Sequence, residues 1–427
     1  MKNRGFTLIE VMVGAAVAIL VIGVVMATFL SQQRSMQTLD LSREASNAGR
    51  DALLSLQGTI GRAGYGIDPR YAFDLRSYNC SSYTGATTAT NACRDKIDGP
   101  DQLVFVERDP NYYWSGTPTS TVQGCDDATA PCFGHAWQVL NTFTTTSPYQ
   151  VQINARTNDK FPIGQVVQIV CAKGANPTMG TVSAVTGSPP GVVTLTLKDP
   201  IANNHYTDNI QGASGTALHD ACFDQPGKTL FLVNRYRYFV MSLVPQQAAG
   251  TGTPAAEPWL MLDRGLDYNG NGTTPEGTTG DTADLIPIAR GVEGFQVSYL
   301  LKPANTSPPN APDSNGNWII GDAPGVLEEP DPGATAPLQN TPDTDTSRFT
   351  MHPANIRGVR LRLTIRSVLK DLSAGTTFAG DPAVPAGLTA IENRNNFGGV
   401  TLGGYRRYFS SVAVATPNLN SKDPFIF

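Results

Sequence analysis

The sequence predicts an α+β fold in which one long amino-terminal helix packs on an antiparallel β-sheet, with an extra β-rich region inserted. The first observation is an apolar run from Phe6 to Phe29, in which Glu10 is the one charged residue. The second is a change, after about Gln102, to short β-branched and aromatic runs separated by Gly, Pro and Asn. Such runs are typical of strands in an antiparallel sheet.

The composition of the 427-residue chain favours a loop-rich extracytoplasmic β protein over a helical cytosolic enzyme. Charged residues are only 16% of the chain, whereas glycine and proline occupy 42 and 31 positions, as expected where turns are frequent. The net charge of −5 provides no broad basic surface. We therefore expect no nucleic-acid partner.

The apolar run is long enough to cross a membrane. Phe6–Phe29 spans about 24 residues, or roughly 36 Å as a helix, against roughly 30 Å for the hydrocarbon core of a bilayer. Lys2 and Arg4 precede the run, and the positive-inside rule places that end in the cytoplasm. Glu10 is costly there, because insertion scales assign an acid at a helix centre about +2.5 to +3.5 kcal/mol. Either this acid reaches an interface, or another group supplies a partner charge.

Helical periodicity continues beyond the apolar run. Apolar residues recur at spacings of three and four, with one adjacent pair, at Ala45, Ala48, Ala52, Leu53, Leu56 and Ile60. Gly61, Gly64 and then Pro69 end the pattern. A helix from Phe6 to about Ile60 would be roughly 80 Å long, with its second half against a globular domain.

Strands are expected in nine later runs: 101–107, 149–155, 164–172, 191–198, 228–244, 258–264, 292–301, 356–369 and 405–416. Within VRLRLTIRS, an apolar set alternates with a polar set that we expect to form a solvated basic face. The two sets are Val359, Leu361, Leu363 and Ile365, and Arg360, Arg362, Thr364 and Arg366. Residues 303–342 are rich in proline and poor in aliphatic residues, which predicts a long surface loop.

The six cysteines form no CxxC pair, and the histidines are not at metal-ligand spacing. An even number of cysteines behind an export segment favours disulfides. Many connectivities are open, and free buried thiols are the alternative. We favour pairs of neighbours: Cys80 with Cys93, Cys125 with Cys132, and Cys171 with Cys222.

The stretch GFTLIE, after a short basic leader, resembles the type III signal of type IV prepilins. In that family a prepilin peptidase cuts after the glycine and methylates the new terminal phenylalanine. The resemblance implies cleavage after Gly5, N-methylation of Phe6, and pairing of Glu10 with the terminal amine of a neighbouring subunit. An α-ammonium has an ordinary pKa of about 7.7–8, so the new terminus would be mostly charged at neutral pH.

Later segments resemble, in order along the chain, the PilW family of minor pilins. These segments are IGRAGYGID (60–68), YRYFV (236–240), PWLMLDRG (258–265), RGVEGFQVSYLL (290–301) and YRRYFSSVAVATPNLN (405–420). The resemblance covers roughly residues 1–75 and 229–416. It implies a type IV pilin-like fold divided into a leader (1–5), a transmembrane or filament-core helix (6–29), its amphipathic continuation (30–64), a β-rich insertion with all six cysteines (65–228) and a pilin-like sheet (229–427).

The resemblance implies a minor pilin that primes assembly of a type IV pilus and joins a tip complex for adhesion or twitching motility. Its partners would be other minor pilins and the major pilin through their amino-terminal helices, the prepilin peptidase, the inner-membrane assembly platform and a tip adhesin. It would be a single-pass inner-membrane protein with a cytoplasmic amino terminus, and later a component of the pilus tip at the cell surface. A J-type minor pseudopilin of type II secretion, which shares this layout, is one alternative. A membrane-anchored adhesin or ligand-binding module that never enters a filament is another.

The sequence offers no catalytic residues, and we expect no enzyme. The segment CFDQPGKT (222–229) lacks the first glycine of a P-loop, and no crossover helix follows, so we interpret it as a turn entering a strand. DYNGNG matches the start of a calcium loop at Asp267, Asn269 and Asn271, but its twelfth position is Thr278 rather than Glu. We expect no cofactor and favour an Asn-Gly turn here, with calcium binding as the alternative.

Overall fold

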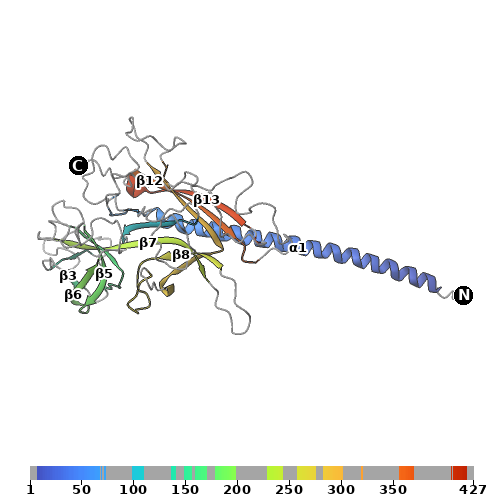
Figure 1. The fold of residues 1–427 in the computed structure, drawn as a ribbon, viewed down its shortest axis with the longest axis horizontal. Helices are drawn as coiled ribbons and strands as arrows, with labels where there is room; N and C mark the ends of the chain where they lie inside the picture. Colours follow the sequence, from blue (N-terminus) through green and yellow to red (C-terminus); the bar gives the residue numbers. More distant parts are fainter. Residues whose placement is uncertain are drawn as a thin grey trace, which may run out of the picture.

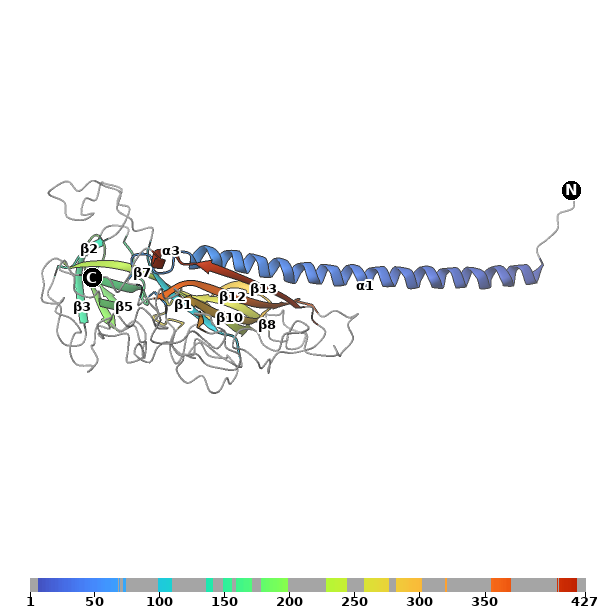
Figure 2. The ribbon, with the colours of Figure 1, turned by 90° about the horizontal axis from the view of Figure 1, so that it is seen from above.

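The structure, a computed structural model, consists of a long projecting helix and a β-rich head (Figures 1 and 2). It describes residues 7–67, 69, 72–73, 99–109, 136–140, 149–155, 159–170, 178–198, 228–243, 257–275, 282–301, 319–320, 355–369, 405 and 407–420. The helix leaves the head at one end and its first turn lies far from the head, so the described structure is elongated (Figure 2).

Helix α1 (Leu8–Ile60) runs without interruption through the apolar run and its continuation, which confirms the predicted helix over the described residues. Only its second half is buried, along the face formed by Leu41, Ala45, Gly49, Ala52, Leu53, Leu56 and Ile60. This face contains most of the residues that periodicity predicted, together with Leu41 and Gly49. At Gly49 a Cβ would lie 2.8 Å from Cδ1 of Ile365, so the helix approaches the sheet closely because this residue has no side chain.

The strands form two antiparallel sheets. The larger has nine strands in the order β3-β6-β5-β4-β7-β8-β9, with β1 and β2 also paired to β7; the smaller has the order β11-β10-β12-β13. The strands are β1 (Gln102–Arg108), β2 (Ala136–Gln138), β3 (Tyr149–Ala155), β4 (Val166–Val170), β5 (Thr178–Thr186), β6 (Gly191–Lys198), β7 (Thr229–Leu243), β8 (Glu257–Asp263), β9 (Ile286–Arg290), β10 (Val292–Leu301), β11 (Ile319–Ile320), β12 (Ile356–Arg366) and β13 (Arg407–Ala415). Two short elements, η3 (Thr282–Asp284) and α3 (Pro417–Asn420), complete the described structure.

The main core lies between α1 and both sheets. It combines side chains of the helix with side chains of β1, β7, β8 and β9 from the larger sheet and of β10, β12 and β13 from the smaller one. Leu56, Ile60 and Phe105 are fully buried in it. Burying an aliphatic or phenylalanine side chain contributes about 1.5–3 kcal/mol relative to leaving it exposed, so this core fastens the helix to the head.

The chain passes from the larger sheet to the smaller one at Gly291, between β9 and β10. The Gly291 amide donates to the carbonyl of Pro258 and its carbonyl accepts from the amide of Arg366, both at 2.8 Å. Its φ is +82°, and a Cβ would lie 2.4 Å from the carbonyl oxygen of Arg366. Only glycine therefore fits where the two sheets meet.

Strand β7 belongs to two packing units. Its amino-terminal part pairs with β4 on one edge and β2 on the other, whereas its later part pairs with β8 and β1. A bridge between Val139 and Ile153 joins the end of β2 to β3. Strands β3, β6, β5, β4, β7 and β2 thus close into a small barrel, whose strands β3, β5 and β6 lie at the end of the head far from the amino terminus (Figure 1).

The small barrel has its own apolar core. Its buried residues are Trp137, Tyr149, Val151, Ile153, Ala155, Phe161, Val167, Ile169, Val182, Val193, Leu195, Leu197, Leu230 and Leu232. The ring of Trp137 packs edge-on against Phe161, and its indole N–H donates to Asp159 Oδ2 at 2.8 Å. The range 65–228 assigned to the insertion supplies most of this barrel, but it also supplies β1, which packs in the main core.

Strand β12 departs from the expected solvated basic face. Arg360 and Arg362 are half-buried, but Arg366 is buried, as is Thr364. The guanidinium of Arg366 forms an ion pair with Glu293 at 3.2 Å and lies 4.3 Å from the ring centre of Tyr405. The expectation was wrong at the end of the strand, where the neighbouring strand supplies a buried acid.

Candidate functional site

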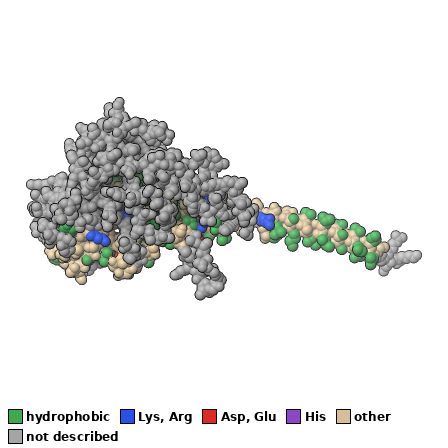
Figure 3. All heavy atoms as spheres, viewed as in Figure 1, with side chains coloured by type: hydrophobic (Ala, Val, Ile, Leu, Met, Phe, Trp, Pro, Cys, Tyr) green, Lys and Arg blue, Asp and Glu red, His purple; other side chains and the backbone are tan. Residues whose placement is uncertain are grey.

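The projecting half of α1 exposes an unbroken apolar surface. Every residue from Thr7 to Gln37 is exposed, and Figure 3 shows hydrophobic side chains along the projecting helix beyond the basic side chain next to the head. Between Glu10 and Arg34 the helix contains no charged residue. Such a surface is unfavourable in water. The helix is long and apolar enough to cross a membrane.

Glu10 caps the start of this helix. Its Oε2 accepts from the amide and the hydroxyl of Thr7 at 2.9 and 3.0 Å, while the Glu10 amide donates to Thr7 Oγ1 at 3.4 Å. This reciprocal arrangement is a capping box, which satisfies amides that the first turn cannot bond internally. The acid at position 10 therefore already has one local partner, and its side chain is exposed at the end of the apolar surface.

The other processing and disulfide residues lie outside the described residues. These are Gly5, Phe6 and the six cysteines at positions 80, 93, 125, 132, 171 and 222. Most of the proline-rich stretch 303–342 lies outside them as well. Cleavage, methylation and disulfide pairing stay predictions.

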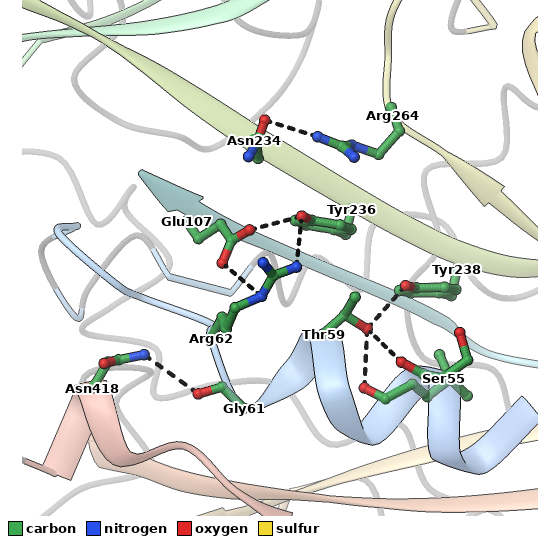
Figure 4. A network of polar contacts seen from close by, with 11 residues as sticks. Ser55, Thr59, Gly61, Arg62, Glu107, Asn234, Tyr236, Tyr238, Arg264 and Asn418 are labelled. Carbon is green, nitrogen blue, oxygen red and sulfur yellow. Dashed lines mark hydrogen bonds and ion pairs between the residues drawn. The ribbon is translucent and has the colours of Figure 1, made fainter. Parts of the chain in front are cut away.

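A buried polar network fastens the end of α1 to the larger sheet (Figure 4). Glu107 on β1 is fully buried, and its Oε1 accepts from the hydroxyl of Tyr236 on β7 at 2.7 Å. Arg62, just after the helix, lies 3.4 Å from Glu107 Oε2 and donates to the Tyr236 hydroxyl at 3.2 Å. Burial raises the pKa of the Glu107 carboxyl; the Tyr236 hydrogen bond and the Arg62 charge oppose the rise only in part.

Further contacts extend the network on both sides. Arg264 lies over the Tyr236 ring, 4.4 Å from its centre, and donates to Asn234 Oδ1 at 2.8 Å. On the helix side, the Thr59 hydroxyl is hydrogen-bonded to the hydroxyl of Tyr238 at 3.0 Å. Figure 4 shows these side chains converging from the helix end, from β1 and β7, and from Arg264 just after β8. The network therefore fixes the orientation of the helix end on the head, in addition to apolar packing.

The sequence did not reveal this network. Glu107 and Tyr236 are separated by 129 residues, and Arg62 lies in a segment that we had assigned only to the end of the helix. A charged residue at the end of the apolar run LVFV is the one local signal. It indicates a buried acid but does not name its partners.

The loop after β8 brings together the three residues of the calcium hypothesis. Asp267 Oδ1 accepts from the amides of Gly270 and Asn271 at 2.6 and 3.2 Å, and its Oδ2 accepts from the amide of Gly272 at 2.7 Å. Asn269 Oδ1 in turn accepts from the Asn271 amide at 3.0 Å. Gly270 and Gly272 have φ values of +74° and +81°, which give the loop its tight curl.

Within the described residues, no group of three or more His, Cys, Asp or Glu side chains is arranged to hold a metal ion. The loop around Asp267 is not such a group, because its residues 269 and 271 are asparagines rather than acids. Comparisons with protein-family models, curated proteins and solved structures found no match for the chain.

Proposed function

We propose that the chain is a minor pilin of a type IV pilus, which primes assembly and lies in a complex at the filament tip. The observation that carries the proposal is the division of α1 into an exposed apolar half and a half docked on the head. Such a helix leaves a membrane only if another apolar surface covers it. Lateral packing of similar helices in a filament core provides that surface.

The size of the head supports a place at the tip. The small barrel and the main core lie in series away from the exposed helix (Figure 2), so the head extends well beyond the helix that anchors it. A head of this size is difficult to stack along a thin shaft, whereas the end of a filament imposes no such limit. There the barrel could present a binding surface or hold a tip adhesin.

In this proposal Glu10 has two partners in turn. Before assembly it caps its own helix through Thr7. After cleavage at Gly5, the α-ammonium of a neighbouring subunit gives it a charged partner in an apolar environment, where electrostatic attraction is stronger than in water. Hydrogen bonds that involve a charged group contribute about 1.5–3 kcal/mol, which corresponds to roughly 10-fold to 100-fold in an equilibrium.

Two substitutions separate these roles. Glu10→Gln keeps an oxygen that can accept from Thr7 but removes the charge, whereas Thr7→Val removes the hydroxyl of the cap but keeps the acid. Each variant would be produced in the native organism in place of the wild-type chain. Immunoblots would then measure the chain in the inner membrane and in surface filaments removed by shear.

We expect both variants to insert in the membrane normally. Glu10→Gln and Glu10→Ala should enter filaments at roughly one tenth of the normal level or less, and Thr7→Val close to normally. Normal incorporation of Glu10→Gln would refute the charge-pairing role. Failure of Thr7→Val alone would show that Glu10 acts only as a cap.

Two further observations distinguish the alternatives. Loss of surface pili and twitching on deletion of the gene supports the minor pilin, whereas loss of exoprotein export supports a J-type pseudopilin. A Gly5 variant that stays full length yet functions normally would favour a membrane-anchored binding module and refute both.

A further inference from the structure

We propose that the loop Asp267–Gly272, together with Asp284, forms a calcium site at the junction between the small barrel and the main core. The proposal does not depend on the pilin assignment. Its first basis is the loop itself, which has oxygen-bearing side chains at the alternate positions Asp267, Asn269 and Asn271. Asn269 Oδ1 accepts from the amide of Asn271 at 3.0 Å, and Asn271 Oδ1 accepts from the amide of Thr273 at 2.8 Å. Oxygen ligands from carboxylates and amides are those that calcium prefers.

The second and independent basis is the buried carboxylate of Asp284. This residue, on η3, is only 2% exposed, and its Oδ1 accepts from the amides of Tyr268 and Asn269 at 3.0 and 3.1 Å. The acid therefore lies directly against the start of the loop. Its Oδ2 is buried and has no hydrogen-bond partner among the described residues. A buried carboxylate oxygen without a partner is unfavourable, and a bound cation would remove this cost.

The two carboxylates have the charge that calcium needs. Asp267 and Asp284 together neutralise a divalent cation. The amides of Gly270, Asn271 and Gly272 hold the Asp267 carboxylate in one orientation. Each carboxylate oxygen has two lone pairs, so an oxygen that accepts from an amide keeps one for a cation. An Asn-Gly turn alone explains the glycines but not a second acid buried against the loop with an unpartnered oxygen.

The loop also lies where a cation would couple the two packing units. The Asp267 amide donates to the carbonyl of Ile163, in the segment between β3 and β4 of the barrel, at 3.0 Å. Beside it, a Cβ on Gly164 would lie only 1.8 Å from the carbonyl oxygen of Gly265, so the two backbones are in close contact. Calcium in the loop would therefore hold the barrel in a fixed position on the main core.

The first test is calorimetry on the full chain in detergent, after chelator treatment, with calcium chloride as titrant. Extracellular calcium modules bind with dissociation constants of about 10⁻⁴–10⁻³ M, and we expect one saturable event in that range or tighter. Asp267→Asn and Asp284→Asn, which preserve shape, should each weaken binding about tenfold or more. Asp51→Asn, an exposed residue of α1, is the control and should bind normally. Absence of saturable heat up to about 10 mM calcium, or unchanged binding in both loop variants, would overturn the proposal.

The second test keeps every proposed ligand in place, so it does not depend on the folding of the aspartate variants. Tyr268 lies between the first two ligands of the loop and is 53% exposed, so Tyr268→Phe should fold normally. Terbium, which takes the same oxygen ligands as calcium, emits when a nearby tyrosine is excited. We expect sensitised emission from the unmodified chain that calcium displaces, and a large loss of that emission in Tyr268→Phe. Equal emission from both proteins would place the cation elsewhere and overturn the proposal.

Discussion

Gly49 and Gly58 lie on the same helix in different surroundings, so the same substitution should have different effects at the two positions. At Gly49 an added Cβ would lie 2.8 Å from Cδ1 and 3.6 Å from Cγ1 of Ile365, and 3.4 Å from Cδ1 of Tyr408. At Gly58 a Cβ would meet nothing within 4 Å, and the residue is exposed. Alanine is favoured over glycine inside a helix by about 1 kcal/mol at either position.

The two sites differ in packing. Ile365 is fully buried in the main core, so its displacement by a new methyl group disturbs further neighbours; such overpacking costs about 1–3 kcal/mol. We therefore expect Gly58→Ala to stabilise the chain by about 1 kcal/mol, and Gly49→Ala to be neutral or to destabilise it by up to about 2 kcal/mol. Leucine has nearly the same helix propensity as alanine but needs more space. The difference between Gly49→Leu and Gly58→Leu should therefore reach about 3 kcal/mol or more.

The measurement is urea unfolding of the four variants as full chains in detergent, followed by tryptophan fluorescence. Because helix propensity contributes equally at both positions, the difference within each pair isolates the contact of α1 with Ile365 on β12 and Tyr408 on β13. Equal stabilisation by alanine at both positions would show that the helix does not approach the sheet as closely as this geometry requires. A large loss at Gly58 would refute the assignment of its face to solvent.

Two further predictions concern the junctions of the head. The pKa of Glu107 is raised above its ordinary value of 4.5. In the folded state the Glu107 carboxyl therefore keeps its proton at pH values where the unfolded chain has lost it. The free energy of unfolding contributed by Glu107 thus increases as pH falls through the raised pKa towards 4.5. Urea unfolding at several pH values should show wild type gaining stability relative to Glu107→Gln as pH falls in this window, and a constant difference would contradict the raised pKa. Gly291→Ala should destabilise the head by about 2 kcal/mol or more, because it combines a left-handed conformation with a backbone clash. The same substitution at Gly270, whose φ is +74° but whose Cβ would meet nothing within 4 Å, is the matched control and should cost less.

Much of the fold was predictable because local pattern and tertiary structure agree. Strands β3, β6 and β10 begin and end at the residues that their β-branched and aromatic runs indicated. Four strands were missed: β2, β5, β9 and β11. The last has only two residues, Ile319–Ile320, and lies within the stretch 303–342 that was expected to be a surface loop. β5 contains Gly180, Ser183 and Ala184, β9 contains Pro287, and β2 is only three residues long. In these strands pairing partners, rather than intrinsic propensity, maintain the extended conformation.

The candidate sites divide in the same way. The acid at position 10 and the loop at Asp267 are local patterns, and the sequence identified both. Even the capping box was present as Thr7-Leu8-Ile9-Glu10, although we did not use it. Arg62 and Glu107 could not be assigned partners, because they meet Tyr236 only when β1 and β7 pair in the larger sheet. Asp284 meets the amides of Tyr268 and Asn269 within the connection between β8 and β9, which no sequence pattern indicated. The closure of the barrel was hidden as well, since it requires one strand to serve two cores.

This sharing of β7 determines how the head transmits force. In the proposed function, a filament or membrane would hold the chain by the exposed half of α1. The docked half of the helix would then carry a load into the main core through the face from Leu41 to Ile60. From there β7 runs continuously into the barrel, where Leu230 and Leu232 contribute to the second core. A load applied at the barrel therefore acts along a strand that is hydrogen-bonded on both edges, rather than through a flexible linker. Separating the barrel from the helix requires these ladders to break together, which is the property expected of a head that binds at one end and is anchored at the other.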